Sequence, residues 1–408
     1  MIFCTTLCLL AGFTIVDAVP TITAKGSKLF TSRGDQFYVR GIAYQLVPDD
    51  PLINTTQCRL DASLMQTIGT NSIRVYHVDP SADHTGCMEV FANAGIYLWL
   101  DLDTFNTQID QRQPMWNVTQ RNAFAKVMDA FHHFDNLAGF YVGNEVVWSG
   151  DGFAATPYIK AAARDMKAHR DASNYRKIPI GYSNADLESL RPTLQNYLAC
   201  GNASDTLDFF SLNAYSWCGI SNYQISGYEM LKQNSSEYSI PIFFSETGCN
   251  QSPPRTFQDQ AAVFGEMADK WSGSIVYEWI QEANNYGLIK YGEKVDLGPS
   301  APPDGFPRSG TPTPVQPDFD NLSNVWKTPL PTGIQQSDYT PTLSAPACPQ
   351  YTAGVWEIEP ASALPTLGQT HKAEKANFAQ PTSAASANQR YKVHSIGTVL
   401  LSVLALVM

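Results

Sequence analysis

The sequence predicts a (β/α)8 TIM barrel, a fold of the α/β class, followed by a disordered C-terminal stalk. Two observations predict the barrel. Eight short apolar runs alternate with helical patterns, and the runs are apolar on both faces. Strands of this kind, joined by connections long enough for a helix, form a parallel sheet with both faces covered. Eight strands is the count of a closed barrel, and a doubly wound sheet is the alternative.

The strands follow in order along the chain, with helical segments between them. The eight runs are residues 37–45, 72–78, 96–103, 139–145, 178–184, 208–215, 240–247 and 274–280. Between the third and fourth runs, residues 118–134 place Phe124, Val127, Met128 and Phe131 at helical spacing. Residues 158–171 and 259–271 show the same period. We therefore expect a helix in each of these three connections.

The two ends of the chain carry targeting signals. Residues 1–18 are largely apolar and finish in small residues before Ala18, which is typical of a cleaved signal peptide. Residues 396–408 are a short apolar tail without a following charge, too short for a spanning helix, which needs about 20 residues. Small residues and a polar spacer precede that tail, so we predict a GPI-attachment signal over residues 387–408. A tail anchor is the alternative. Ser386 is the favoured attachment residue, and Ser383 and Ala385 are the other candidates.

Composition divides the remaining chain into a folded part and a stalk. Residues 351–386 are rich in Ser, Thr, Ala and Pro and hold few large apolar residues. Such a segment cannot bury enough surface to offset its loss of conformational entropy. We therefore predict a flexible, O-glycosylated stalk there and a catalytic domain over residues 19–350. The 408 residues carry a net charge of −11, which argues against nucleic acid as a partner.

Cysteines and glycosylation signals agree with a secreted protein. Two of the eight cysteines leave with the signal peptide, and the even number that remains suits disulfides, whose pairing the spacing alone leaves open. No C-x-x-C motif suggests zinc or redox chemistry. Asn-X-Ser/Thr sequons predict N-glycosylation. The predicted sites are Asn54, Asn117, Asn202, Asn234 and Asn321.

A barrel places its catalytic residues where the strands end, at the carboxyl-terminal face. The fourth run ends in Asn144-Glu145 and the seventh in Glu246. In a barrel of eight strands these two ends lie across the mouth from each other. Two such carboxyl groups are what glycoside hydrolysis requires, one as an acid and one as a base or nucleophile. The other strand ends carry amides, phenols and further carboxylates, which suit a polyhydroxylated substrate.

Four motifs then resemble a known family. "IRVY" (residues 73–76), "GNEV" (143–146), "SLNAYSWCG" (211–219) and "FSETGCN" (244–250) are similar to the β-1,3-glucanosyltransferases of glycoside hydrolase family 72. These are fungal, GPI-anchored enzymes that remodel the cell wall. The resemblance covers about residues 20–350 and includes both targeting signals. No cysteine follows Cys348, so the chain resembles the group without the Cys-rich carbohydrate-binding module.

The resemblance implies a retaining mechanism, a set of site residues and a disulfide pairing. Glu145 would be the acid/base and Glu246 the nucleophile, with their carboxyl groups about 5–5.5 Å apart. The implied glucan-binding residues are Tyr76, Asp103, Asn106, Gln111, Asn144, Asp186, Arg191, Tyr215, Tyr277 and Tyr286. The implied disulfides are Cys58–Cys87, Cys200–Cys348 and Cys218–Cys249. Thr247 departs from the family, since many members carry Tyr at this position.

The function expected from the sequence is therefore elongation of cell-wall β-1,3-glucan by transfer between donor and acceptor chains. The enzyme would act as a monomer, without a cofactor or metal, on the outer leaflet of the plasma membrane or in the wall. A calcium loop at residues 101–112 is excluded by Phe105 and by the lack of a central Gly. Two alternatives are a β-1,3-glucanase that only hydrolyses and a non-catalytic wall-glucan-binding protein. The presence of both glutamates argues against the second.

Overall fold

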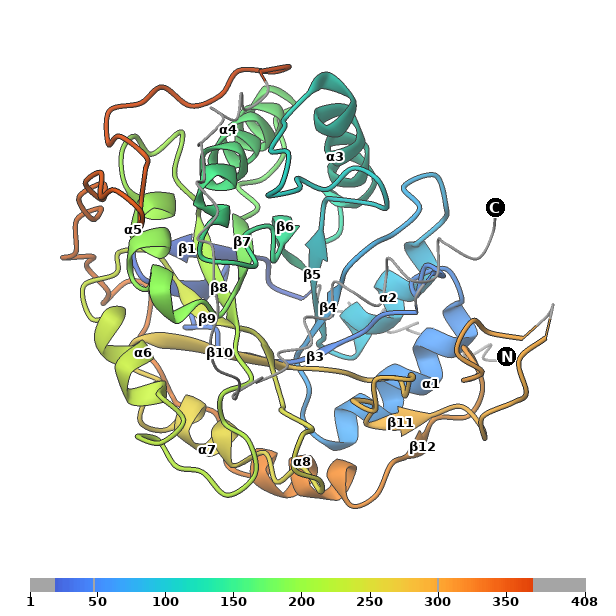
Figure 1. Ribbon diagram of the computed structural model, residues 1–408. Coiled ribbons are helices and arrows are strands. Elements are labelled where there is room, and N and C mark those ends of the chain that lie inside the picture. Colours follow the sequence, from blue (N-terminus) through green and yellow to red (C-terminus); the bar gives the residue numbers. More distant parts are fainter. Residues whose placement is uncertain (1–18, 47, 299–300, 370–408) are drawn as a thin grey trace, which may run out of the picture.

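Eight parallel strands close into a barrel in the computed structural model, which describes residues 19–46, 48–298 and 301–369 (Figure 1). Strand β10 pairs with β3 and closes the ring. The prediction of a TIM barrel is confirmed, and each predicted run overlaps one strand, although β6 and β10 begin before their runs. The barrel strands are β3 (Val39–Ala43), β4 (Ser72–Val75), β5 (Tyr97–Asp101), β6 (Leu137–Asn144), β7 (Ile180–Ala185), β8 (Phe209–Asn213), β9 (Ile242–Thr247) and β10 (Trp271–Val276).

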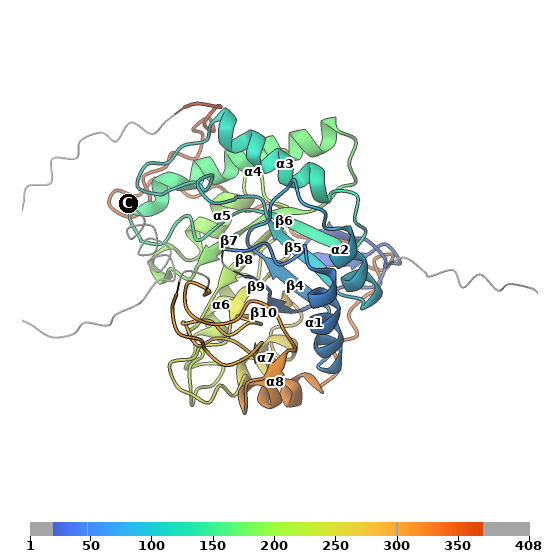
Figure 2. The ribbon, with the colours of Figure 1, turned by 90° about the vertical axis from the view of Figure 1, so that its right-hand side faces the viewer.

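Helices surround the barrel on its outer side (Figure 2). They are α1 (Thr55–Thr67), α2 (Thr85–Asn93), α3 (Val118–Phe131), α4 (Thr156–Ala172), α5 (Thr193–Ala199), α6 (Tyr228–Asn234), α7 (Gln258–Phe264) and α8 (Asp318–Trp326), with 3₁₀ turns η1 (Gly152–Ala155) and η2 (Glu188–Leu190). Helix α7 is shorter than its period predicts, because Gly265 follows its last turn and Trp271 already belongs to β10. Within the described ranges, no helix is long and apolar enough to cross a membrane.

Aromatic side chains fill the barrel interior. Trp99, Phe209 and Phe243 are fully buried there, and the Trp99 ring lies 5.1 Å from Phe209 and 4.8 Å from Phe243. Glycines on the neighbouring strands make room for these rings. A Cβ atom at Gly139 would lie 2.8 Å from Trp99, and one at Gly181 would lie 2.5 Å from Phe209. The interior is therefore a packed core, as in other barrels of this size.

A hairpin that the sequence analysis did not predict covers the amino-terminal end of the barrel. It is formed by β1 (Ile22–Lys25) and β2 (Lys28–Thr31). Its apolar residues Ile22 and Leu29 are fully buried in the same core cluster as Val39 and Trp99. A second small hairpin, β11 (Ile289–Lys290) and β12 (Thr313–Pro314), follows the last barrel strand. The first hairpin therefore adds its apolar residues to the core of the barrel.

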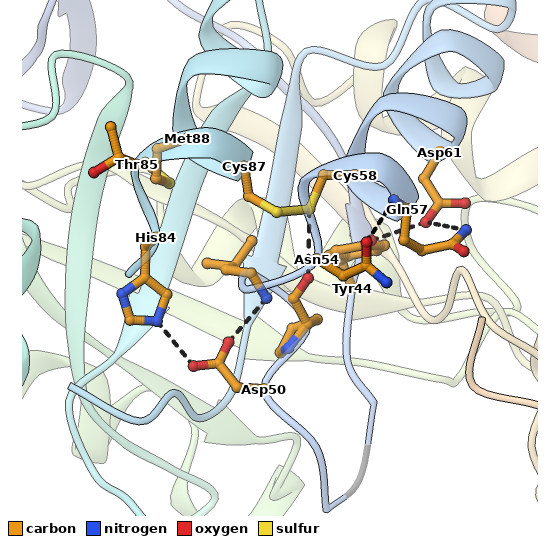
Figure 3. Close-up of a disulfide and its surroundings, with 12 residues drawn as sticks. Tyr44, Asp50, Asn54, Gln57, Cys58, Asp61, His84, Thr85, Cys87 and Met88 are labelled. Carbon is orange, nitrogen blue, oxygen red and sulfur yellow. Dashed lines mark hydrogen bonds and ion pairs between the residues drawn. A yellow bond between two sulfur atoms is a disulfide. The ribbon is translucent and has the colours of Figure 1, made fainter. Parts of the chain in front are cut away.

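Three disulfides tie the connections together, with the pairing that the family resemblance implies. Cys58–Cys87 joins α1 to α2, as Figure 3 shows. Beside it, Asp50 bonds to the ring of His84 at 2.9 Å (Figure 3), and both side chains are almost fully buried. Cys200–Cys348 links the end of α5 to the C-terminal segment. Cys218–Cys249 links the loops after β8 and β9, which both carry site residues.

The segment after Cys348 packs on the barrel, and the predicted stalk is wrong for residues 351–369. Trp356 is 1% exposed and its ring lies 5.3 Å from that of Tyr197. Arg164 donates to the carbonyl oxygen of Pro365 at 3.1 Å. The prediction from composition was wrong because a disulfide already holds the start of the segment against an apolar surface. A few further contacts are then enough to order the segment. The rest of the predicted stalk, the signal peptide 1–18 and the GPI signal 387–408 lie outside the described residues.

The five predicted glycosylation sites differ in how their side chains are used. Asn54 and Asn117 cap α1 and α3 through Oδ1, which leaves the amide nitrogen as the atom for a glycan. Asn202 is exposed and Asn234 is half-buried. Asn321 donates its Nδ2 to the carbonyl oxygen of Arg255 at 2.7 Å. Glycosylation at Asn321 would therefore compete with an internal hydrogen bond, and we expect it to be the poorest acceptor.

Candidate active site

Glu145 follows β6 directly and has a left-handed backbone with φ 47°. This conformation is uncommon for a residue other than glycine and costs on the order of 1–3 kcal/mol. Hydrogen bonds hold both the backbone and the side chain of Glu145. The Glu145 amide donates to the carbonyl oxygen of Ser183 at 2.8 Å, and its Oε1 accepts from Nδ2 of Asn213 at 3.0 Å. Such a strained residue at a strand end is typical of a functional site.

Glu246 lies inside β9, is 3% exposed, and accepts hydrogen bonds on both carboxyl oxygens. The hydroxyl of Tyr76 donates to Oε1 at 2.9 Å, and that of Tyr215 donates to Oε2 at 2.6 Å. Nη1 of Arg74 lies 3.5 Å from Oε1. All three contacts favour the ionised carboxylate. Glu246 is therefore placed and charged as a nucleophile would be.

Arg74 is the centre of the polar network under the site, and the sequence analysis did not select it. It is fully buried on β4 and pairs with both carboxyl oxygens of Asp101, at 3.1 and 2.9 Å. It also donates to Oδ1 of Asn144 at 3.0 Å and to Ser183 at 3.1 Å. The neighbouring carboxylate raises the pKa of Arg74 against the effect of burial, so the guanidinium stays charged. A charged residue inside an apolar strand was the signal that could have identified it.

The side-chain carbonyl oxygen of Asn144 accepts hydrogen bonds from other residues of the protein. Its Oδ1 accepts from Arg74, from Oγ of Ser183 and from Nδ2 of Asn213, each at 3.0 Å. Ser245 extends this network, because its hydroxyl donates to Oδ1 of Asn213 at 2.7 Å. With Oδ1 fixed by three donors, the amide nitrogen of Asn144 is the atom that would meet a substrate hydroxyl. The network thus fixes both the orientation of Asn144 and the position of Glu145.

The two glutamates form a coupled acid pair. Burial raises the pKa of Glu145. Burial and the charge of Glu145 together raise the pKa of Glu246 to about 7. Because Glu145 contributes to that rise, the value describes the loss of the second proton from the pair. Glu246 accepts from two hydroxyls and Arg74, whereas Glu145 accepts from one amide, so the remaining proton is better placed on Glu145.

Four tyrosines line the side of the site next to Glu246. The rings of Tyr215 and Tyr286 lie 5.6 Å apart, those of Tyr277 and Tyr286 lie 5.3 Å apart, and Tyr76 lies 6.3 Å from Tyr277. Every pair meets edge to face. Tyr286 is half-buried, whereas Tyr277 is 3% exposed. The structure thus brings together all four tyrosines that the sequence predicts for glucan binding.

A third carboxyl group, that of Glu278, is linked to this aromatic cluster by hydrogen bonds. Glu278 is fully buried, and its Oε2 accepts from Nε2 of Gln45 at 2.7 Å. The same nitrogen lies 2.6 Å from the Tyr277 hydroxyl. The other oxygen of Glu278 accepts from Nδ2 of Asn284 at 2.7 Å, and Asn284 in turn accepts from the amide of Tyr286. Burial raises the pKa of Glu278 well above its usual value. Glu278 thus positions Tyr277 and Tyr286.

The predicted residues after β5 have different surroundings. Asp103 is enclosed near Asp101, and burial together with that neighbour raises the pKa of Asp103 to about 8. Asn106 is exposed in a turn and has φ 70°. Gln111 does not reach the glutamates. Its side chain bonds to the loop after Glu145, accepting from the amide of Trp148 at 2.9 Å. Gln111 therefore fixes a loop of the site.

Asp186 and Arg191 bind each other in a salt bridge on the loop after β7. Both side chains are half-buried, with 13% and 19% exposed. Burial raises the pKa of Asp186, and Arg191 opposes that rise. Neither residue has a hydrogen bond to Glu145 or Glu246 within the described part of the chain.

The loops behind the nucleophile are braced. Cys218–Cys249 joins the segment after Tyr215 to the segment after Glu246. Thr247, where the family resemblance implies Tyr in many members, is fully buried, and its hydroxyl accepts from Nε2 of Gln260 at 3.0 Å. Gln260 also links to β10, because its Oε1 accepts from Ser274 at 2.7 Å. Thr247 thus points away from the mouth and takes part in barrel packing.

Comparisons with known proteins agree with this geometry. The sequence model of the family described as glucanosyltransferase matches residues 11–298. Protein EPD1 of Candida maltosa is 43% identical over 282 residues, which cover 67% of this chain and 51% of that protein. The 1,3-beta-glucanosyltransferase gas2 of Schizosaccharomyces pombe is 36% identical over 369 residues, which cover 86% of this chain and 76% of that protein.

Solved structures agree as well. The structure of Saccharomyces cerevisiae Gas2p in complex with laminaritriose and laminaritetraose superposes with a TM-score of 0.76 at 36% identity. The match covers 88% of this chain and 78% of that one. The chain spans about half the length of several curated relatives, namely 51% of EPD1 and 53% of pH-responsive protein 1 of Candida albicans.

Proposed function

The chain belongs to glycoside hydrolase family 72, the glucanosyltransferases, and on that premise we propose that it is a β-1,3-glucanosyltransferase. One observation supports this most directly: the half-buried Glu145 after β6 and the buried Glu246 in β9 share one polar network and differ in hydrogen bonding. The named relative from S. pombe is a 1,3-beta-glucanosyltransferase, and the Gas2p structure contains laminari-oligosaccharides. The proposed substrates are accordingly β-1,3-glucan chains, as donor and as acceptor.

The proposed mechanism is a retaining double displacement. Glu246 attacks the anomeric carbon of the donor, the bond from that carbon to the leaving oxygen breaks, and Glu145 gives its proton to that oxygen. The result is a glucosyl ester on Glu246. A hydroxyl of an acceptor glucan then attacks the same carbon, Glu145 takes the hydroxyl proton, and Glu246 is released. This route requires the two carboxyl groups to lie about 5–5.5 Å apart.

The surrounding residues have roles that follow from their contacts. The hydroxyls of Tyr76 and Tyr215 keep Glu246 ionised before the attack and stabilise it as a leaving carboxylate in the second step. The amide nitrogen of Asn144 is directed to the 2-hydroxyl of the donor sugar, where contacts strengthen in the transition state. The edge-to-face tyrosines offer apolar surface for sugar rings and hydroxyls for their rims.

We also propose where the enzyme works. A signal peptide over residues 1–18 and a GPI attachment at Ser386 would place the folded part on the outer leaflet of the plasma membrane, with access to the wall. The enzyme would act there as a monomer. Release of the protein from membranes by a phosphatidylinositol-specific phospholipase tests the anchor. Detection of the Ile396–Met408 peptide in the mature protein by mass spectrometry would contradict it.

Product sizing tests the activity. The mature protein is incubated with a reduced laminari-oligosaccharide, and the products are separated by length. Products longer than the substrate indicate transfer, and this is the expected result. Only shorter products would indicate a hydrolytic β-1,3-glucanase. No change in length, together with retention on insoluble glucan, would indicate a wall-glucan-binding protein.

A further inference from the structure

A buried arginine lies on the loop between β9 and α7, beyond the nucleophile. Arg255 is 3% exposed, and an arginine is almost never buried to this degree unless its charge is paired. Asp318, in the first turn of α8, pairs with Nε of Arg255 at 2.6 Å. This contact leaves the terminal nitrogens Nη1 and Nη2 of the guanidinium to donate elsewhere.

Helix α8 fixes both the backbone and the side chain of Arg255. The Arg255 amide donates to Oδ1 of Asp318 at 3.1 Å, and Nε donates to Oδ2 at 2.6 Å. Nδ2 of Asn321 donates to the carbonyl oxygen of Arg255 at 2.7 Å. Nearby, Phe257 has a φ of 52°, which is uncommon for a residue other than glycine, and its ring lies 4.9 Å from the guanidinium. The guanidinium is therefore held in one place.

The terminal nitrogens of Arg255 hold the loop after β10, which carries two tyrosines of the site. Nη1 donates to the carbonyl oxygen of Tyr277 at 3.0 Å, and Nη2 donates to that of Gly287 at 3.4 Å. The Glu278 amide closes this loop by donating to the carbonyl oxygen of Tyr286 at 3.2 Å. The guanidinium also lies 6.0 Å from the centre of the Tyr286 ring. Arg255 therefore joins the start and the end of the segment that bears both tyrosines.

The catalytic pair is held by other parts of the barrel. Hydrogen bonds to Glu145 and Glu246 come from β4, β7, β8 and the segments that follow β4 and β8. Binding groups that are already fixed lose less conformational freedom when a ligand binds. We propose that Arg255 and Asp318 are positioning residues for sugar binding, which fix the loop that presents Tyr277 and Tyr286 and take no part in bond cleavage. This inference rests on the proposed function.

A second buried arginine provides a matched control. Arg170 on α4 is 4% exposed, pairs with Asp208 at 3.1 Å and donates to the carbonyl oxygen of Ile178 at 2.7 Å. Ile178 and Asp208 precede β7 and β8, so they lie at the end of the barrel opposite the catalytic face. Arg170→Met therefore removes a similar buried pair without touching the site.

Binding and kinetics separate positioning from stability. Reduced laminarihexaose is titrated by calorimetry into mature protein carrying Glu246→Gln, and KM and kcat for the same substrate are measured in active protein. Arg255→Met is expected to raise Kd and KM about three- to tenfold, the range of one aromatic contact, while kcat changes by less than about twofold. Arg255→Lys keeps the charge without the planar fork, so it should restore part of the loss. Asp318→Asn should raise both constants less than Arg255→Met, and Arg170→Met should leave them unchanged.

Hydrogen exchange tests the loop itself without relying on activity. The amides of Glu278 and Leu288 donate within the loop, to the carbonyl oxygens of Tyr286 and Glu278. In Arg255→Met the peptide over residues 277–288 should exchange about three- to tenfold faster than in wild type, because the loop opens more often. In Arg170→Met the same peptide should exchange at the wild-type rate.

Two results would overturn the positioning role. One is an increase in KM that is the same for Arg255→Met and Arg170→Met, and the other is a loop that exchanges equally fast in both. If Arg255→Met does not fold, Arg255→Lys and Asp318→Asn give the same comparison. A wild-type protein that neither binds nor lengthens glucan overturns the proposed function instead, and the exchange rates then still decide whether Arg255 fixes the loop.

Discussion

The two glutamates of the site lie in contrasting surroundings, although both follow an apolar strand. Glu246 belongs to β9 itself, and both of its oxygens accept from rigid donors on neighbouring strands and loops. Glu145 lies just past β6, has a left-handed backbone and accepts from a single amide. The first arrangement keeps a carboxylate charged, while the second leaves a carboxyl group able to hold and release a proton. The difference in hydrogen bonding therefore assigns the two roles.

The largest expected effects come from removing each carboxyl group separately. Glu246→Gln should lower kcat by on the order of 10⁴-fold or more, because no nucleophile remains. Glu145→Gln should lower it by about 10²–10⁴-fold, the usual contribution of a general acid. Activity is measured as the rate at which laminari-oligosaccharide is consumed at saturating concentration.

Donors with a good leaving group sharpen the test, since their oxygen needs no proton. Glu145→Gln should regain formation of the glucosyl ester from an activated aryl laminaribioside, whereas Glu246→Gln should not. Circular dichroism controls for folding of both variants. Recovery by Glu246→Gln alone would reverse the assignment of the two roles.

The next largest effect concerns Arg74, which serves both halves of the site. Arg74→Met leaves Asp101 buried without its partner, and breaking a buried pair from one side typically costs about 3–5 kcal/mol. We expect a loss of this size in the free energy of unfolding, measured by urea denaturation at pH 7. The double variant Arg74→Met/Asp101→Leu should recover part of it, because no unpaired charge remains. A single variant as stable as wild type would mean that the pair contributes nothing.

The sequence predicted the strands, both glutamates and the four tyrosines, and it did so for different physical reasons. Strands buried on both faces have a clear apolar signature, and a carboxylate at the end of such a strand is conspicuous. The disulfide pairing and Tyr286 followed only from the family resemblance, whereas Tyr76, Tyr215 and Tyr277 also follow strands of the predicted barrel. Arg74 was missed because its partners, Asp101 on β5 and Ser183 on β7, are distant in sequence. The packing of Trp356 was missed because the composition of its own segment does not show the apolar surface that other parts of the chain form for it.

A smaller effect should appear in the pH dependence of stability. A carboxyl group whose pKa is raised by folding stabilises the folded state below its unfolded pKa, and this contribution is lost as the pH rises through the folded value. The coupled pair of Glu145 and Glu246 loses its second proton at about 7, so the window in which stability changes runs from 4.5 to about 7. Gln cannot ionise, so Glu246→Gln should become more stable relative to wild type by about 3 kcal/mol between pH 4 and pH 8.

Urea denaturation at both pH values measures this difference. Glu237→Gln, at an exposed position, serves as the control for a general effect of removing a carboxyl group. A difference between wild type and Glu246→Gln that stays constant from pH 4 to pH 8 would contradict a buried carboxyl group with a raised pKa.

The smallest effect tests whether hydroxyl donors maintain the contrast between the glutamates. The wild-type kcat/KM should fall above pH about 7, where the pair loses its second proton and Glu145 can no longer act as an acid. It should also fall at acidic pH, where Glu246 is protonated.

The Tyr215 hydroxyl donates to Glu246 at 2.6 Å and favours its ionised form. A hydrogen bond to a charged group contributes about 1.5–3 kcal/mol, equivalent to about one to two pKa units. Tyr215→Phe should therefore move the acidic limb upward by that amount. Tyr286→Phe removes a hydroxyl from a ring 5.6 Å from Tyr215, and it is the matched control. If both variants keep the wild-type acidic limb, the Tyr215 hydroxyl does not hold the charge on Glu246, and Tyr76 and Arg74 must supply that stabilisation.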